Sequence, residues 1–315
     1  MKTALLNTGR LPPALEGRLA DAYEVAQLPA DKSERAAFLA GRGTEFTALV
    51  TSAAIGADAA LLAALPKLRV ISSFGVGLDQ LDLAAAQARG IAVGYTPDVL
   101  NDCVADLAFG LMLDVGRGMS AADRFVRRGE WPKGQFPLMR KVSGARLGVV
   151  GMGRIGRAIA QRSNGFAMDV RYHTRRVVAD LPWPHEPSLL ELARWADFLI
   201  VITAGGAGTR HLIDAQVLDA LGPEGFLINV ARGTVIDEAA LVRALVEKRI
   251  AGAGLDVYEN EPQVPAELMA LDNVVLLPHI ASATRETRRA MADRVFDNLQ
   301  SFFEHGRLVS AATAS

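Results

Sequence analysis

Cysteine is almost absent from this sequence. Cys103 is the one cysteine among 315 residues, so no internal disulfide framework can form, and a single thiol fits a reducing compartment. Long apolar runs are missing too, since nothing approaches the roughly 20 residues that span a bilayer. The apolar run at residues 1–8 ends at Gly9 without a small-residue cleavage pattern. We therefore predict a cytoplasmic protein with no membrane partner.

An excess of charge of either sign is also lacking. The chain has 34 Lys and Arg residues against 35 Asp and Glu residues, a formal net charge of −1. Such a chain has no bulk attraction to nucleic acid or to anionic lipid, so we expect small-molecule partners and no nucleic acid. We find no solenoid repeat and no low-complexity segment beyond a short Ala/Ser tail. Half of the residues are hydrophobic, which argues against disorder, and the length suggests about two domains.

The pattern that is present is an alternation of short apolar runs with helix-like segments. This alternation predicts an α/β fold of parallel sheets covered by helices. We expect strands at residues 3–7, 46–51, 68–73, 91–94, 170–173, 198–203, 226–230, 253–257 and 274–277. We expect helices at residues 11–22, 57–65, 78–89, 188–195, 215–221, 237–248 and 284–305, and a long helix from residue 99 with Asp98 as its N-cap. Residues 129–144 are the least regular region and are interpreted as an exposed connection or arm.

A glycine-rich turn follows a predicted buried strand at residues 146–150. Gly151, Gly153 and Gly156 match the G-x-G-x-x-G dinucleotide fingerprint. The first glycine allows a tight turn, the second lets the backbone approach a pyrophosphate, and the third lets the helix pack closely on the strand. A helix is expected to open at Arg154 and Ile155, where unpaired N–H groups favour a bound phosphate. Glycines also mark ordinary turns, but this strand–turn–helix setting favours a dinucleotide cofactor.

The end of the next strand indicates which dinucleotide is used. A carboxylate there would bind the ribose diol of NAD(H), whereas a cation would accept the additional 2′-phosphate of NADP(H). The sequence has no acid at this point and has Thr174, Arg175 and Arg176 instead. A solvated basic loop is the alternative interpretation. Because arginine suits a planar phosphate contact, we predict that NADP(H) is preferred over NAD(H).

Three polar segments lie at the expected carboxyl ends of strands, where open α/β sheets bind ligands. Arg232 can hold a substrate carboxylate and polarise a carbonyl, and His279 can act as general acid. Glu261, if it pairs with His279, would favour the imidazolium and fix its orientation. Each residue also has a purely structural interpretation. Arg232 could be a surface cation, Glu261 a turn residue before a proline, and His279 a polar residue bonded to the backbone.

Together these motifs resemble the D-isomer-specific 2-hydroxyacid dehydrogenases, particularly the glyoxylate and hydroxypyruvate reductase branch, over essentially the whole chain. The resemblance depends on residues 151–156, 229–233, 256–262 and 278–284. It implies two doubly wound parallel-sheet domains with a cleft between them. A Rossmann nucleotide-binding domain would span residues 99–286, and a discontinuous flavodoxin-like substrate domain would span residues 1–98 and 287–315.

The resemblance also implies roles for particular residues. Arg232, Glu261 and His279 would form the catalytic set, with Ser73, Val76 and Gly77 in a substrate loop whose Val76 and Gly77 amides bind the carboxylate. Along the cofactor it places Val104, Thr203, Val230, Asp256 and His279, although Val104 and Val230 fit a plain core equally well. One departure is Ala204–Gly205–Gly206–Ala207–Gly208, where many members have Pro-Leu-Thr, so contacts from that loop are not carried over.

We therefore predict an NADPH-dependent reductase that converts a small 2-oxo acid, glyoxylate or hydroxypyruvate, to the D-2-hydroxy acid without a metal. The alternatives are a reductase of a bulkier acid, such as 4-hydroxyphenylpyruvate or 2-ketogluconate, and a nucleotide-sensing corepressor-like interaction protein. The resemblance further implies a homodimer through the nucleotide-binding domain. The arm at residues 131–139, with Trp131 and Met139 at its ends, would then reach the neighbouring subunit.

Overall fold

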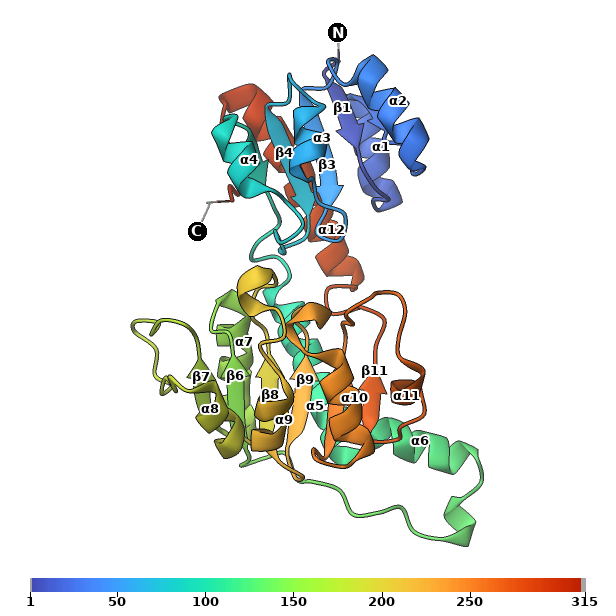
Figure 1. Ribbon diagram of the computed structural model, residues 1–315, viewed down its shortest axis with the longest axis vertical. Helices are drawn as coiled ribbons and strands as arrows, with labels where there is room; N and C mark the ends of the chain where they lie inside the picture. Colours follow the sequence, from blue (N-terminus) through green and yellow to red (C-terminus); the bar gives the residue numbers. More distant parts are fainter. Residues whose placement is uncertain (1, 313–315) are drawn as a thin grey trace. The chain divides into compact units, whose positions relative to one another are not determined.

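The structure is a computed structural model that describes residues 2–312. Met1 and residues 313–315, which the predicted first domain includes, lie outside the described residues. The chain forms two compact units (Figure 1), which divide after Leu100 and after Ala283. Unit 1 contains the residues up to Leu100 and those from Thr284 onward, and unit 2 is Asn101–Ala283. The boundaries expected from the sequence were at residues 98 and 286.

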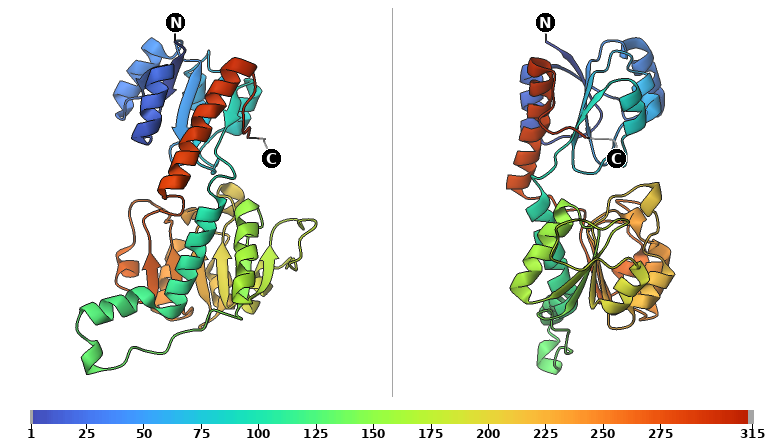
Figure 2. Two further views of the ribbon diagram at one scale, coloured as in Figure 1. Left: turned by 180° about the vertical axis from the view of Figure 1, so that it is seen from behind. Right: turned by 90° about the vertical axis from the view of Figure 1, so that its left-hand side faces the viewer.

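Unit 1 is a parallel sheet with helices on both faces (Figure 2). Its strand order is β2-β1-β3-β4-β5, which is the flavodoxin-like order. The strands are β1 (Ala4–Asn7), β2 (Glu24–Gln27), β3 (Ala48–Ser52), β4 (Val70–Phe74) and β5 (Ala92–Gly94). One face is covered by α1 (Pro13–Ala22) and α12 (Arg285–His305), the other by α2 (Lys32–Arg42), α3 (Ala59–Ala63) and α4 (Leu83–Ala88).

The C-terminal helix α12 supplies part of the core of unit 1. Its Val295 and Leu299 are fully buried, as expected for an apolar stripe that faces a sheet. The Ser72 hydroxyl of β4 donates to the Val295 carbonyl at 3.1 Å. The Thr284 side chain caps the first turn of the helix by accepting from the Thr287 N–H. A segment about 200 residues downstream of β4 thereby completes this unit.

Unit 2 is a second parallel sheet, with the order β11-β10-β9-β8-β6-β7. The order reverses at β6, so doubly wound folds of this kind bind ligands at the carboxyl ends of β6 and β8. The strands are β6 (Arg146–Val150), β7 (Asp169–His173), β8 (Phe198–Val201), β9 (Phe226–Asn229), β10 (Gly252–Leu255) and β11 (Val274–Leu276). One face carries α5 (Asn101–Arg117) and α7 (Arg154–Arg162), the other α8 (Leu189–Trp195), α9 (Ala215–Leu221), α10 (Glu238–Val246) and α11 (Ala266–Met269). The prediction of two doubly wound parallel-sheet domains is confirmed.

Four helices and strands were not predicted: the four-residue α11, and three elements that lack a fully buried apolar stripe. β2 is an edge strand with three of its four residues exposed. α2 contains no buried residue, although Asp31 caps it by accepting from the Ser33 and Glu34 N–H groups. α6 (Met119–Arg127) also contains no buried residue and begins after Gly118, whose φ of 60° ends α5. Periodicity cannot identify elements whose side chains remain in solvent.

The prediction that Asp98 caps the long helix was wrong. α5 begins at Asn101, so two residues separate Asp98 from the helix. Asp98 has a φ of 70°, which is the left-handed region that aspartate tolerates better than most residues. Its role in the backbone is therefore to turn the chain before the helix rather than to begin it.

The arm at residues 131–139 is irregular and exposed. It contains one 3-10 turn, Trp131–Lys133, and no further helix or strand up to residue 139. Trp131 is 66% exposed and Leu138 is 102% exposed, which is unusual for large apolar side chains. Within residues 2–312, none of the helices has the length and hydropathy required to cross a lipid bilayer.

Candidate active site

The glycine turn after β6 has the geometry of a phosphate cradle. Gly151 has a φ of 106°, and a Cβ there would lie 2.8 Å from the Ile202 carbonyl oxygen. A Cβ on Gly156 would lie 2.1 Å from the Gly151 oxygen, so only glycine lets α7 approach this turn so closely. A Cβ on Gly153 would meet nothing within 4 Å. The open space at Gly153, directly before the N-terminus of α7, fits the approach of a pyrophosphate.

The turn that carries Arg232 follows β9 and is fixed by Asn229. The Asn229 side chain accepts from the Ala231 N–H at 3.0 Å and donates to the Arg232 carbonyl at 3.1 Å. The next residue, Gly233, lies against the following loop, because a Cβ there would be 1.9 Å from the Tyr258 carbonyl carbon. The guanidinium of Arg232 donates to the Ala231 carbonyl at 2.7 Å. This packing holds Arg232 beside the loop that contains Glu261.

His279 and Glu261 form a hydrogen-bonded pair across two strand ends. The Nδ1 of His279, after β11, lies 2.7 Å from Oε2 of Glu261, after β10. Glu261 Oε1 also accepts from the Tyr258 N–H at 3.1 Å, which fixes the carboxylate. Because a carboxylate only accepts, Nδ1 carries the proton, and Nε2 is the nitrogen left for a ligand. Both side chains remain partly open to solvent, 44% for His279 and 34% for Glu261.

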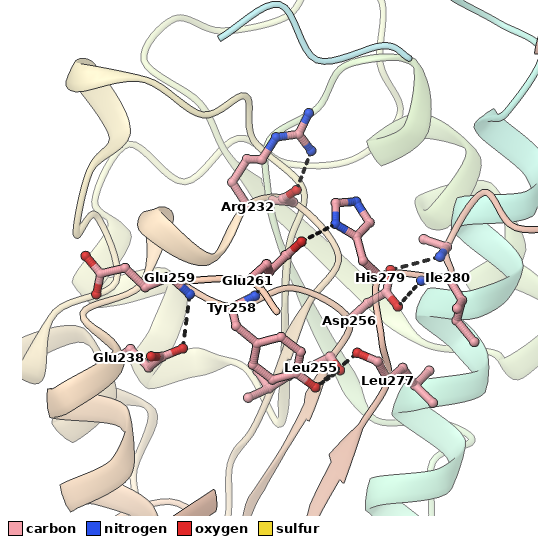
Figure 3. A network of polar contacts seen from close by, with 12 residues as sticks. Arg232, Glu238, Leu255, Asp256, Tyr258, Glu259, Glu261, Leu277, His279 and Ile280 are labelled. Carbon is pink, nitrogen blue, oxygen red and sulfur yellow. Dashed lines mark hydrogen bonds and ion pairs between the residues drawn. The ribbon is translucent and has the colours of Figure 1, made fainter. Parts of the chain in front are cut away.

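Electrostatics favour the ionised form of Glu261. Burial raises its pKa, but the hydrogen bond and charge of His279, the Tyr258 N–H and the charge of Arg232 outweigh burial. The net pKa of Glu261 therefore lies below its ordinary value. Figure 3 shows Arg232, Glu261 and His279 gathered at the same end of the strands. The structure thus brings the three predicted residues together.

Asp256 holds the turn that presents His279. Its two carboxylate oxygens accept from the Ile280 N–H at 2.7 Å and the Ala281 N–H at 2.8 Å. Its carbonyl accepts from the His279 N–H at 2.9 Å. His279 has a φ of 54°, a costly conformation that persists where the surroundings impose it. Asp256 is fully buried, and burial raises its pKa against the opposing effect of the two N–H groups.

The residues expected along the cofactor differ in exposure. Val104 and Val230 are buried, at 4% and 6% exposed, and Thr203 is intermediate. Arg175 and Arg176, after β7, are exposed. Among residues 2–312 neither of these two guanidinium groups has a carboxylate partner. Two cations that the protein itself does not neutralise suit an anionic ligand.

The expected substrate loop belongs to unit 1 and follows β4. Gly75 has a φ of 145° and exchanges two bonds with Thr96: its N–H donates to the Thr96 hydroxyl at 3.1 Å, and its carbonyl accepts from the Thr96 N–H at 3.0 Å. Ser73 is fully buried, and its hydroxyl has no hydrogen-bond partner in the described part of the chain. The backbone N–H groups of Val76 and Gly77 also have no hydrogen-bond partner among residues 2–312.

Comparison with known proteins agrees with this geometry. Residues 109–281 match the NAD-binding-domain model of the D-isomer specific 2-hydroxyacid dehydrogenases. The chain belongs to this family. It is 46% identical to glyoxylate/hydroxypyruvate reductase A of Arabidopsis thaliana over 88% of each chain. It is 49% identical to hydroxyphenylpyruvate reductase of Plectranthus scutellarioides over 84% of this chain and 85% of the relative.

A solved structure of the family has nearly the same fold. It is the NADPH-dependent glyoxylate/hydroxypyruvate reductase of Sinorhizobium meliloti in complex with NADP and malonate, with a TM-score of 0.92 and 42% identity over 99% of this chain and 97% of that one. The chain is therefore an oxidoreductase that uses a nicotinamide dinucleotide. This confirms the predicted family and enzyme class.

The residues that support the catalytic set of this dehydrogenase were not predicted from the sequence. Asn229 and Tyr258 lie within the predicted motifs but were assigned no role, although the first fixes the Arg232 turn and the second binds Glu261. The Tyr258 hydroxyl also donates to the Leu277 carbonyl at 3.0 Å, which joins the ends of β10 and β11. An asparagine directly before a turn is a signal that could have been used, since its amide bonds readily to neighbouring backbone.

Proposed function

We propose that this dehydrogenase reduces a small 2-oxo acid to the D-2-hydroxy acid with NADPH, with glyoxylate or hydroxypyruvate as the substrate. The observation that carries the proposal is the 2.7 Å pair of His279 and Glu261 beside Arg232. A general acid, a carboxylate that orients it and a fixed cation are the groups that carbonyl reduction requires from a protein.

In this proposal the bound nicotinamide supplies the hydride to the carbonyl carbon. His279 donates the proton from Nε2 to the carbonyl oxygen, so that C=O becomes CH–OH. Glu261 keeps the opposite nitrogen protonated and stabilises the imidazolium. Arg232 binds the carboxylate and polarises the carbonyl, and the N–H groups of Val76 and Gly77 bind the carboxylate as well. Asp256 would lie on the nicotinamide side, and Val104, Thr203 and Val230 would line the cofactor.

The NADPH preference is proposed from the end of β7. At Thr174, Arg175 and Arg176 the two guanidinium groups have no carboxylate partner among residues 2–312, which suits a 2′-phosphate. The relative from Sinorhizobium meliloti, described as NADPH-dependent and bound to NADP, supports this proposal. Replacing both arginines with alanine should weaken NADPH use far more than NADH use. Equal losses would contradict the 2′-phosphate assignment.

The substrate is tested with a panel of 2-oxo acids assayed with NADPH and with NADH. We expect the highest kcat/KM with glyoxylate or hydroxypyruvate. Because hydroxyphenylpyruvate reductase is a relative at 49% identity, a bulkier acid is the second candidate. A higher kcat/KM with 4-hydroxyphenylpyruvate than with glyoxylate and hydroxypyruvate would favour this second candidate. Oxidation of neither nucleotide with any acid would indicate a nucleotide-sensing interaction protein.

We also propose a homodimer that forms through unit 2. The arm and the adjoining α6 expose Trp131, Leu138, Val126, Met119 and Met139, with exposed fractions from 41% to 102%. Apolar side chains gathered in this way are typical of protein interfaces. Sedimentation should show a dimer, and the double variant Trp131→Ser, Leu138→Ser should sediment as a monomer. A monomeric wild type would contradict the proposal. A cytoplasmic location stays a prediction.

A further inference from the structure

The segment after β7 folds back on the strand that it leaves. Tyr172 and His185 pair in a parallel bridge. The Tyr172 N–H donates to the Pro184 carbonyl at 3.0 Å, and its carbonyl accepts from the Glu186 N–H at 2.7 Å. The residues between them, 174–183, therefore form a closed excursion at the edge of the sheet. Arg175 and Arg176 lie at its beginning.

His185 holds the first residue of that excursion. Its Nε2 lies 2.9 Å from the Thr174 carbonyl oxygen, and since a carbonyl can only accept, this nitrogen donates. The Thr174 hydroxyl in turn donates to the Arg176 carbonyl at 2.6 Å. The two bonds connect His185 through Thr174 to the backbone of both arginines. They restrict the conformations that the turn can adopt.

Packing limits the position of the His185 ring itself. Its centroid lies 5.1 Å from the Tyr172 ring and 6.4 Å from the His173 ring, with an interplanar angle of 13° to the latter. The Tyr172 hydroxyl donates to the Val178 carbonyl and accepts from the Val178 N–H, which closes the other side of the turn. The His185 ring is thus packed against its two aromatic neighbours and is only partly exposed.

The same turn is connected to the glycine fingerprint. The Gly151 N–H donates to the His173 carbonyl at 3.0 Å. The guanidinium of Arg175 extends toward the loop after β8, since a Cβ on Gly208 would lie 4.0 Å from its Nη1. Gly208 belongs to the Ala204–Gly208 departure, so this part of the loop lies beside the Arg175 guanidinium. Arg175 is therefore directed toward the cofactor end of the sheet.

We infer that His185 is a positioning residue for the 2′-phosphate of NADP(H), one that fixes the Thr174–Arg176 turn without touching the phosphate. This inference rests on the proposed NADPH preference. A turn that is ordered before binding loses less conformational entropy when the phosphate arrives. Loss of the His185 bond should therefore weaken phosphate recognition while the arginines remain present.

The test measures binding by calorimetry with 2′,5′-ADP and with 5′-AMP, which differ by the 2′-phosphate. In His185→Ala the affinity for 2′,5′-ADP should fall about fivefold, the effect of one neutral hydrogen bond, and that for 5′-AMP by less than about twofold. His185→Gln, whose amide can donate at a similar reach, should recover most of the loss. Val177→Ala, in the same excursion with a side chain 69% exposed, is the matched control and should behave as wild type.

The outcomes separate the two proposals. If the wild type binds 2′,5′-ADP no better than 5′-AMP, the proposed NADPH preference fails. The second case is a wild type that prefers 2′,5′-ADP to 5′-AMP and a double variant, Arg175→Ala with Arg176→Ala, that has lost this preference. If His185→Ala then keeps the full preference, only the role of His185 is overturned. Adding His185→Ala to the double arginine variant should cause no further loss, because the residue acts through those arginines. An additional loss there would also overturn the inference.

Discussion

The two ends of the unit 2 sheet use the same kinds of charged residue for different purposes. At the amino end, Asp197 accepts from Arg146 and Arg140 at 2.8 and 2.9 Å, and its side chain is only 11% exposed. At the carboxyl end, His279 and Glu261 pair but remain 44% and 34% exposed. Removing the nearly buried Asp197 carboxylate would leave two arginines uncompensated, whereas the partly open pair can meet a ligand. Whether a charged residue of this sheet contributes to stability or to the reaction therefore depends on the end of the strands at which it lies, rather than on its residue type.

The sharpest test of this comparison is His279→Ala. Removing the proposed general acid should lower kcat by about 10²- to 10⁴-fold, with KM changing much less. The melting temperature should stay within a few degrees of wild type, because the side chain is partly open to solvent. Steady-state kinetics and calorimetry check both parts. Near wild-type turnover would remove His279 from the proposed mechanism.

Asp197→Asn should show the opposite pattern. Leaving two arginines without their buried carboxylate should lower the free energy of unfolding by about 2 kcal/mol, with kcat unchanged. Burial raises the pKa of Asp197, but the hydrogen bonds and charges of Arg146 and Arg140 outweigh it, so the net pKa is lowered.

This lowered pKa gives the effect of Asp197 a pH dependence. Its stabilising contribution is fully present above the ordinary carboxyl value of 3.8 and is lost as the pH falls through the folded-state pKa. The difference in melting temperature between wild type and variant should therefore shrink below that pH. A difference that grows in acid would contradict the assignment.

Asp256→Asn combines features of both ends of the sheet. Asp256 is buried, as Asp197 is, but it lies at the carboxyl end of the unit 2 strands, as His279 does. The amide retains one acceptor but loses the second, so one of the Ile280 and Ala281 N–H groups is left without its bond. We expect kcat to fall about tenfold because His279 is presented less accurately, together with a modest loss of stability. A loss of stability with unchanged kcat would make Asp256 purely structural.

The smallest effect concerns Tyr258, beside the same site. Burial, followed by the charge of Asp256, raises its pKa to about 12 from the ordinary 10.0. Absorbance titration should show a late-ionising tyrosine that disappears in Tyr258→Phe. Its contribution to stability is fully present below pH 10 and is lost as the pH rises through the folded-state pKa. Tyr23, in unit 1, also has a raised pKa, from burial and then the charge of Glu304, so Tyr23→Phe is the matched control.

The features that follow from local pattern could be predicted from the amino-acid sequence. Buried strands such as Phe198–Val201 and Phe226–Asn229 were identifiable because parallel strands covered on both faces form apolar runs. The glycine fingerprint and the residues Arg232, Glu261 and His279 were identifiable because spacing and residue type restrict what such turns can do. Asp98 was misassigned because its backbone conformation is a property of the folded chain.

How these segments meet in space became apparent from the three-dimensional fold. The 2.7 Å approach of His279 to Glu261, the left-handed backbone of His279 and its support by the buried Asp256 join the ends of β10 and β11. The approach of the Arg232 turn to Tyr258, which only a glycine at 233 permits, joins β9 to them. Such contacts depend on sheet order and register, which place residues distant in the chain within hydrogen-bond reach, and no local pattern encodes these distances.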